Sequence, residues 1–140
     1  MKVAVVDASV AVKWVVDEEF SDRAEALLTG TTLCAPAHWQ VEAVNAIWGQ
    51  VHRGRFSAEE GSQRASTLIS APVEAVPVAA LFDRAFNLAV ALRVTVYDSL
   101  YVALAKVRDI PLVSADRRLL RRMMAEPTLA ALARPLADLR

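Results

Sequence analysis

The sequence predicts an α/β fold of three layers, in which helices cover both faces of a central, mostly parallel sheet of four to five strands. Short, continuously apolar segments such as residues 3–6 (VAVV) alternate with longer segments of helical character. Continuously apolar strands are typical of parallel sheets, which are buried on both faces. The 140 residues are 55% apolar and 23% charged and contain no repeat or linker, so we expect residues 1–140 to form one domain.

The first half of the chain is expected to contain two strands and three helices. Ser21 offers a hydroxyl that can cap a helix ending at Gly30, and Pro36 closes the second strand. The third helix has an apolar stripe, formed by Val44, Ile47, Trp48 and Val51. The predicted strands cover residues 2–6 and 31–35, and the predicted helices cover about 9–16, 21–30 and 37–52.

The second half continues the alternation. Ser57 and Glu60 have the spacing of a capping box, which predicts a helix start, and Asp116 begins the last clear helix. Residues 129–139 are compatible with a helical turn or an edge strand. The predicted helices cover residues 57–70, 78–92, 98–107 and 116–124, and the predicted strands cover 73–76 and 111–114.

Charge is balanced overall but unevenly distributed. Sixteen Lys and Arg offset sixteen Asp and Glu, so total charge does not indicate a nucleic-acid binder. Residues 1–30 hold six acids against three bases, whereas residues 106–140 hold eight bases against four acids. Two interpretations of the basic end stay open, namely contact with phosphates or a solvated helix face, and they concern Arg117, Arg118, Arg121 and Arg122.

Cysteine content and hydropathy bear on location. Cys34 is the only cysteine, which excludes an internal disulfide and a cysteine metal site and fits a reducing cytoplasm. Its apolar neighbours predict a core position. Asp7 and Lys13 interrupt the first apolar run, and no stretch approaches the ~20 apolar residues of a membrane span. We therefore expect a soluble, cytoplasmic protein without a membrane partner.

Two acids follow predicted strands directly. Asp7 follows the strand at 2–6, and Asp116 follows the strand at 111–114. Ligands of open parallel sheets bind outside the carboxyl ends of the strands, so both side chains are expected in one region. The alternative for each is a helix cap, a role that Asp performs well.

Two further acids belong to helices. Glu42 and Asn45 lie one turn apart on a polar face of the long helix, which is an ordinary exposed face in the simpler interpretation. Asp98 precedes a strongly apolar helix, which it would cap in the simpler interpretation. Together with Asp7 and Asp116 they make a set of four carboxylates.

The four acids lie in four short motifs along the chain. The motifs are Asp7-Ala-Ser9-Val, Glu42-x-x-Asn45-Ala, Tyr97-Asp98-Ser99-Leu-Tyr-Val-Ala-Leu-Ala and Leu112-Val-Ser-Ala-Asp116-x-x-Leu. In order and separation they resemble the motifs of the PIN-domain ribonucleases, especially the VapC-type toxins of toxin–antitoxin pairs. The resemblance covers Lys2 to about Leu120. Ser114 stands where threonine is common in the family, and His38 is not a usual family feature.

The resemblance implies a PIN-like fold and a metal-dependent endoribonuclease in which water attacks a phosphodiester and leaves a 5′-phosphate and a 3′-hydroxyl. It implies an acidic set of Asp7, Glu42, Asp98 and Asp116. Asp7 and Asp98 are expected to be direct ligands, and Glu42 to act through water or a second metal. Ligands that are all oxygen suit Mg²⁺ or Mn²⁺. Hydrogen bonds to the ligands or to phosphate are expected from Ser9, Asn45 and Ser114.

The resemblance also implies partners. These are an RNA substrate, a second copy of the chain in a homodimer, and an antitoxin whose segment crosses a groove of the early helices. Aromatic side chains in those helices would fill the core or anchor the antitoxin, and they are Trp14, Phe20, Trp39 and Trp48.

Three alternatives stay open. One is a PIN-fold binding protein without catalysis. Another is a metal-dependent hydrolase that acts on DNA or another phosphate ester. A zinc site on His38 and Glu42 would need a second histidine, and His52 lies roughly 21 Å further along the same helix at 1.5 Å per residue.

Overall fold

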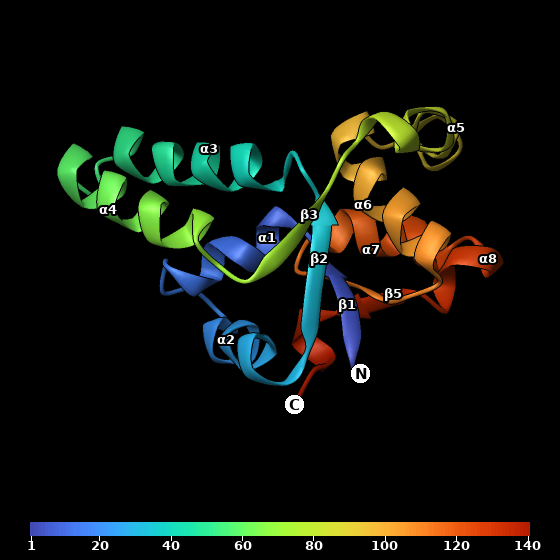
Figure 1. The fold of residues 1–140 in the computed structure, drawn as a ribbon, viewed down its shortest axis with the longest axis horizontal. Coiled ribbons are helices and arrows are strands. Elements are labelled where there is room, and N and C mark those ends of the chain that lie inside the picture. The colour runs from blue at the N-terminus through green and yellow to red at the C-terminus, as the bar shows by residue number, and fades with distance from the viewer.

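A computed structural model describes residues 1–140 as a five-stranded parallel sheet between layers of helices (Figure 1). The strand order is β3-β2-β1-β4-β5, and every neighbouring pair is parallel. The predicted three-layer fold is thereby confirmed. The strands are β1 (Val3–Val6), β2 (Thr32–Pro36), β3 (Val73–Val76), β4 (Leu112–Ser114) and β5 (Ala133–Pro135).

The helices follow the predicted order, with small shifts at their ends. The first predicted helix is one α-helical turn followed by a 3₁₀ turn. The helices are α1 (Ala8–Ala11), α2 (Ser21–Gly30), α3 (Trp39–His52), α4 (Ala58–Ile69), α5 (Phe82–Leu92), α6 (Val96–Arg108), α7 (Arg117–Met124) and α8 (Pro127–Ala130). The 3₁₀ turns are η1 (Val12–Trp14), η2 (Ala79–Leu81) and η3 (Leu136–Asp138).

Apolar side chains bury both faces of the sheet. Along β1, Val5 packs into the cluster on the side of α6, whereas Ala4 and Val6 pack into the cluster that includes α2. Burial on both sides explains why the strand is apolar throughout. Cys34 is buried in the first cluster, as its neighbours in the sequence predicted.

Helix α6 packs against β1, β2 and β4, and α5 packs against α6. Residues 99–105 of α6 are all buried, which is the pattern of a helix surrounded by protein. No single helix is long and apolar enough to cross a membrane. The stretches Ala79–Leu92 and Val96–Arg108 reach that length and composition only as a pair, bent by 113°.

The apolar stripe predicted for α3 is wrong at Trp48, whose side chain is 60% exposed. The helix forms an arm with α4 beyond the sheet (Figure 1), and Trp48 stacks on His52 with ring centroids 5.0 Å apart. A Cβ at Gly61 would lie 2.4 Å from Val51 Cγ2, so glycine allows the close α3–α4 contact. The buried positions of α3 are Trp39, Ala43, Ile47 and Gln50.

Candidate active site

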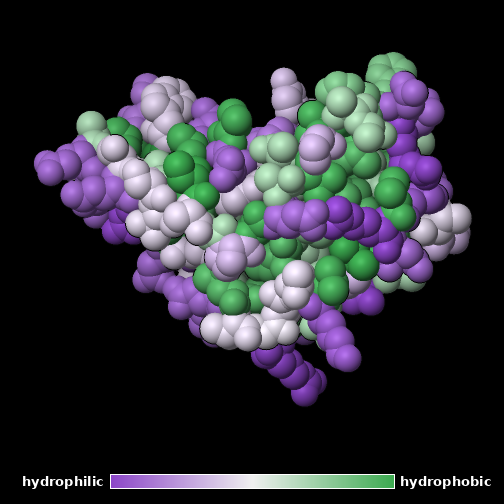
Figure 2. Space-filling model, viewed as in Figure 1, coloured by the Kyte–Doolittle hydropathy of each residue, from purple (hydrophilic) through white to green (hydrophobic).

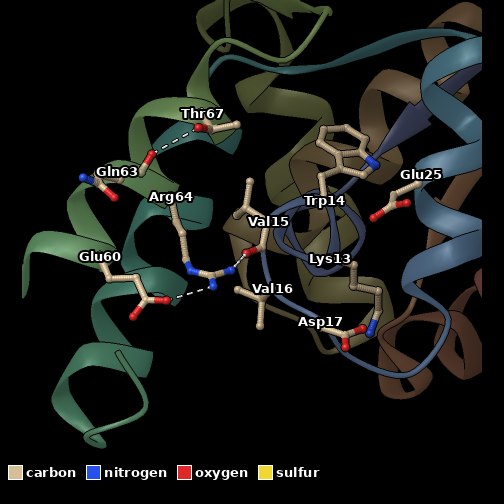
Figure 3. A pocket seen from close by; sticks show the side chains of 10 residues that line it. All are labelled: Lys13, Trp14, Val15, Val16, Asp17, Glu25, Glu60, Gln63, Arg64 and Thr67. Carbon is tan, nitrogen blue, oxygen red and sulfur yellow. Dashed lines mark hydrogen bonds and ion pairs between the residues drawn. The ribbon is translucent and has the colours of Figure 1, made fainter. Parts of the chain in front are cut away.

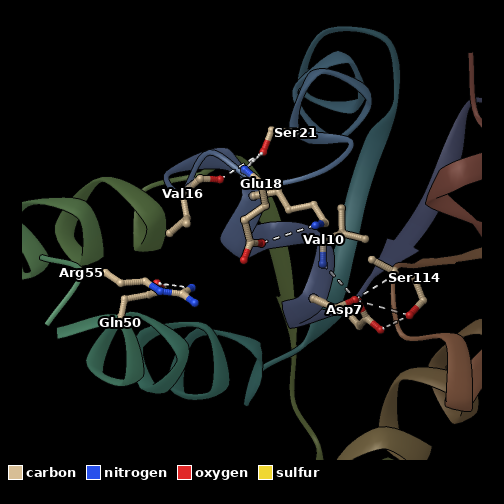
Figure 4. Close-up of polar contacts among 11 residues, drawn as sticks. Asp7, Val10, Val16, Glu18, Ser21, Gln50, Arg55 and Ser114 are labelled. Carbon is tan, nitrogen blue, oxygen red and sulfur yellow. Dashed lines mark hydrogen bonds and ion pairs between the residues drawn. The ribbon is translucent and has the colours of Figure 1, made fainter. Parts of the chain in front are cut away.

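Asp7 stands at the carboxyl end of the central strand and is 5% exposed. Its Oδ1 accepts hydrogen bonds from Ser9 Oγ at 2.5 Å and from the Val10 amide at 3.3 Å. Its Oδ2 accepts from Ser114 Oγ at 2.5 Å. Figure 4 shows Asp7 between the start of α1 and the end of β4. The carboxylate therefore caps α1 and is held both from α1 and from the end of β4.

The two serines join the ends of β1 and β4. Ser9 Oγ accepts a hydrogen bond from the Ala115 amide at 3.0 Å, and Ser114 Oγ accepts one from the Asp116 amide at 3.0 Å. Since each hydroxyl also donates to Asp7, the backbone that carries Asp116 is fixed relative to Asp7. Residues 107 positions apart thus share one hydrogen-bonded unit.

Asp116 and Asp98 differ in how they relate to their helices. Asp116 Oδ1 accepts from the amides of Arg118 and Leu119, so Asp116 does cap α7. Asp98 is not a cap, contrary to the simpler interpretation. The helix begins at Val96, and Thr95 Oγ1 caps it by accepting from the Asp98 amide at 3.2 Å. Asp98 is left with its partly buried carboxylate in the first turn, where a helix favours negative charge.

Glu42 lies in the first turn of α3 and is held by an aromatic partner. Its Oε1 accepts from the Tyr101 hydroxyl at 2.7 Å and lies 3.4 Å from His38 Nε2. His38 Nε2 is also 2.9 Å from the Tyr97 carbonyl oxygen, so this nitrogen carries the proton. Burial first, and then Glu42, raises the pKa of Tyr101 far above its usual range, so the hydroxyl stays a donor.

Sequence reasoning missed the role of Tyr101. The signal was a single phenol in the apolar run that follows Asp98, three residues later and therefore on nearly the same face of α6. The side chain is 1% exposed, and a buried hydroxyl needs a partner. The sequence could not name Glu42 as that partner, because the two residues lie 59 positions apart.

Burial and the negative charge of neighbouring acids raise the pKa values of two of the acids. Burial raises the pKa of Asp7 to about 6, and Asp116 adds to this, although the Ser114, Ser9 and Val10 hydrogen bonds lower it. Burial, then Asp116, then Glu42 raise the pKa of Asp98. None of Asp7, Asp98 and Asp116 takes part in an ion pair. The site therefore concentrates negative charge that no lysine or arginine neutralises by direct pairing.

The donor chemistry suits a hard cation. Carboxylate oxygens without cysteine are the ligands that Mg²⁺ and Mn²⁺ take. Burial is the main cause of the raised pKa values of Asp7 and Asp98, and the neighbouring acids add a repulsion that a cation would compensate. The side chains are not arranged around one point, since no three His, Cys, Asp or Glu groups stand ready to hold an ion. The residues fit a cation by type and charge, and closing around it requires side-chain movement.

Asn45 lies apart from this unit. It is exposed on α3 and lines a hollow of 380 Å³ with Trp48 and Arg53. A different pocket, of 190 Å³, is lined by Asp98 and Asp116. The structure gives Asn45 no hydrogen bond to the acids.

The four arginines of α7 are exposed and form no ion pair. They are Arg117, Arg118, Arg121 and Arg122.

The early helices enclose a further hollow of 520 Å³ (Figure 3). Arg64 of α4 reaches across it, donating to the Val15 carbonyl and pairing with Glu60 at 3.0 Å. Its guanidinium lies 4.1 Å from the ring centroid of Phe56. Trp14 lines the same hollow and packs edge-on against the buried Trp39, with ring centroids 6.4 Å apart.

The parallel strand order β3-β2-β1-β4-β5, with acids directly after the neighbouring strands β1 and β4, is the architecture of one class of α/β domain. The chain belongs to the PIN domain family, whose model matches residues 4–124. Ribonuclease VapC12 of Mycobacterium tuberculosis is 36% identical over 115 residues, which are 82% of this chain and 88% of that relative.

Solved structures share the fold. The crystal structure of PAE2754 from Pyrobaculum aerophilum matches with a TM-score of 0.71 and 22% identity, over 97% of this chain and 92% of that one. VapBC2 from Rickettsia felis, bound to a DNA fragment from its promoter, matches with a TM-score of 0.65 and 13% identity. That match covers 95% of this chain and 98% of the other.

Proposed function

We propose that this protein is a metal-dependent endoribonuclease and the toxin of a toxin–antitoxin pair. The observation that carries the proposal is the unpaired acidic set at the carboxyl ends of β1 and β4, in a chain related to VapC ribonucleases. Figure 2 shows the surface indented between the α3–α4 arm and the α5–α6 end, where a polynucleotide has room to enter.

Each side chain has a distinct role in this mechanism. When bound, Mg²⁺ or Mn²⁺ neutralises phosphate charge and lowers the pKa of a water molecule bound to it. Asp7 and Asp98 are the primary ligands, and Ser9 and Ser114 fix the orientation of Asp7. Tyr101 aims Glu42. Water adds to phosphorus in line as the bond to the 3′ oxygen breaks, giving a 5′-phosphate and a 3′-hydroxyl.

The test is cleavage of labelled single-stranded RNA and of DNA of the same sequence, with Mg²⁺, with Mn²⁺ and with EDTA. We expect cleavage of RNA only, and only with metal. Asp98→Asn should abolish it, whereas Asp109→Asn, at the other end of the same helix, should not. Equal cleavage of DNA would favour the general phosphate-ester hydrolase. Folded wild-type protein that cleaves neither would favour the binding protein.

We further propose that an antitoxin covers the hollow of the early helices. The hollow combines an apolar wall at Trp14 and Val15 with charges of both signs, including Glu25 and Arg64. Such a surface suits an amphipathic peptide. The structural similarity to the VapBC2 assembly supports a partner protein of this kind. In this reading the pair acts in the cytoplasm, where Cys34 stays reduced.

A homodimer through α5 completes the proposal. Phe82, Phe86 and Val90 are spaced by four residues on one face and are 50%, 60% and 66% exposed. Figure 2 shows apolar side chains at the upper right, over this end of the molecule. A stripe of large exposed apolar side chains is typical of a protein interface.

A further inference from the structure

The pocket beside the acids carries charges of both signs that do not pair. Arg93 and Arg118 line its 190 Å³ together with Asp98 and Asp116. None of these four residues forms an ion pair within 4.0 Å. A ligand that carries charges of both signs suits this pocket, because its cation can bind the acids and its anion can bind the arginines.

Arg93 occupies a position that disfavours it. The residue ends α5 with φ 57° and ψ 47°, a left-handed conformation in which the backbone is strained for any residue with a Cβ. Helices that end this way usually place glycine there. The local backbone therefore gives no reason for arginine here, and the exposed Arg93 side chain lines the pocket that holds the acids.

We propose that Arg93 and Arg118 bind a backbone phosphate of the RNA strand next to the bond that is cut. This inference rests on the proposed function and assigns its phosphate-positioning residues. A guanidinium presents two parallel N–H groups that match two phosphate oxygens. Asp98 lines the same pocket, so a phosphate held by the arginines is adjacent to one of the two acids proposed as cation ligands.

Two substitutions of Arg93 distinguish the loss of a phosphate contact from an effect on the left-handed backbone. Arg93→Gln removes the charge, and Arg93→Gly also removes the left-handed strain, so the glycine variant should melt no lower than wild type. Asp109→Gly is the backbone control, because Asp109 ends α6 with φ 53° and lies outside the pocket. Arg84→Gln is the charge control on α5, since Arg84 lines another hollow.

The measurement is binding of a fluorescein-labelled single-stranded RNA, followed by anisotropy in EDTA over a range of salt concentrations. Both Arg93 variants should bind roughly tenfold more weakly, the loss expected for one charge-assisted contact. Their salt slope should fall by about 0.7, the value of one single-strand phosphate contact. Both controls should bind as wild type does. In the cleavage assay Arg93→Gln should raise KM more than it lowers kcat.

Two results of the binding assay would overturn the inference. One is wild-type affinity and salt slope in both Arg93 variants, and the other is an equal loss of binding in Arg84→Gln. The proposed function fails separately. If the wild type binds RNA through Arg93 but cleaves none, the phosphate site stands and the nuclease does not. If the wild type cleaves RNA and Arg93→Gln has an unchanged KM, only the phosphate site is wrong.

Discussion

Asp7 combines burial with strong hydrogen bonding, and the two act in opposite directions on its charge. Three donors stabilise the carboxylate, yet burial dominates and the pKa rises to about 6. Without a cation the group therefore takes up a proton in mildly acidic solution, at a pH where an ordinary Asp stays charged. A divalent cation at the site would stand in place of that proton.

The raised pKa of Asp7 predicts how stability depends on pH. Between the unfolded value of 3.8 and about 6, the folded protein binds a proton that the unfolded chain does not. Its contribution to the free energy of unfolding therefore falls as pH rises through this window, by about 3 kcal/mol for a shift of roughly two units. Urea unfolding in EDTA from pH 4 to pH 7 measures it. Asp7→Asn should flatten this part of the profile, and an unchanged profile in that variant would contradict the assignment.

Asp98 allows a test of metal binding that does not depend on cleavage. Asn is nearly isosteric and removes a charge that Asp116 and Glu42 oppose, so Asp98→Asn should melt at or above wild type in EDTA. Millimolar Mg²⁺ or Mn²⁺ should raise the melting temperature of the wild type, because the ion binds the folded state, and should raise that of Asp98→Asn much less. A variant that melts well below wild type in EDTA would instead indicate a structural role for Asp98.

Sequence spacing predicted where the acids lie but not how they are held. Asp7 and Asp116 each follow an apolar strand, and that pattern is visible in the chain. A cap of α6 by Asp98 is the simpler interpretation of the sequence, but Thr95 three residues earlier performs it. Both residue types cap helices well, so local pattern could not choose between them. The Tyr101–Glu42 hydrogen bond depends on tertiary contact and left no local pattern.

The helices show a similar limit. For α3, a count of large apolar residues favoured Trp48 as a core residue, but the helix buries the smaller Ala43 and the polar Gln50 instead. Helix α3 packs against α4, α1 and η1, so the choice of its buried face depends on tertiary packing that the sequence does not show. The tail was ambiguous between helical turn and edge strand, and it contains both, since α8 leads into β5 and β5 pairs with β4.

If the exposed stripe of α5 is the dimer interface, a charged side chain placed in that stripe should prevent dimerisation. Phe86 lies at its middle, so Phe86→Glu places a charge where two copies would meet, at a desolvation cost that an apolar interface does not offset. Light scattering after size exclusion should give a dimer for wild type and a monomer for the variant, each with an unchanged melting curve at low concentration. Ile69→Glu, an exposed apolar position on α4, is the matched control and should remain dimeric. A dimeric Phe86→Glu protein would move the interface away from α5.

The strand order explains why the acids converge. From β1 the chain proceeds to β2 and β3 on one side of the sheet, and later to β4 and β5 on the other. Such a reversal between neighbouring parallel strands is where open α/β sheets bind ligands, at the carboxyl ends. Asp7 follows β1 and Asp116 follows β4, so they stand on either side of this point. The α3 and α6 helices add Glu42 and Asp98 above it.

The complete molecule should be toxic in a way that depends on this site. If it cuts cellular RNA, induced expression in a bacterial host should arrest growth, and Asp98→Asn should grow normally at equal soluble level because it keeps the fold and loses the charge. Co-expression of the small open reading frame that we expect beside its gene should restore growth to cells that express the wild type. The growth curves need one further measurement, the mapping of newly formed 5′-phosphate ends in RNA shortly after induction, which should appear with wild type and be absent with Asp98→Asn. Unimpaired growth with abundant soluble wild-type protein, or arrest that persists in Asp98→Asn, would contradict a nuclease toxin built on these carboxylates.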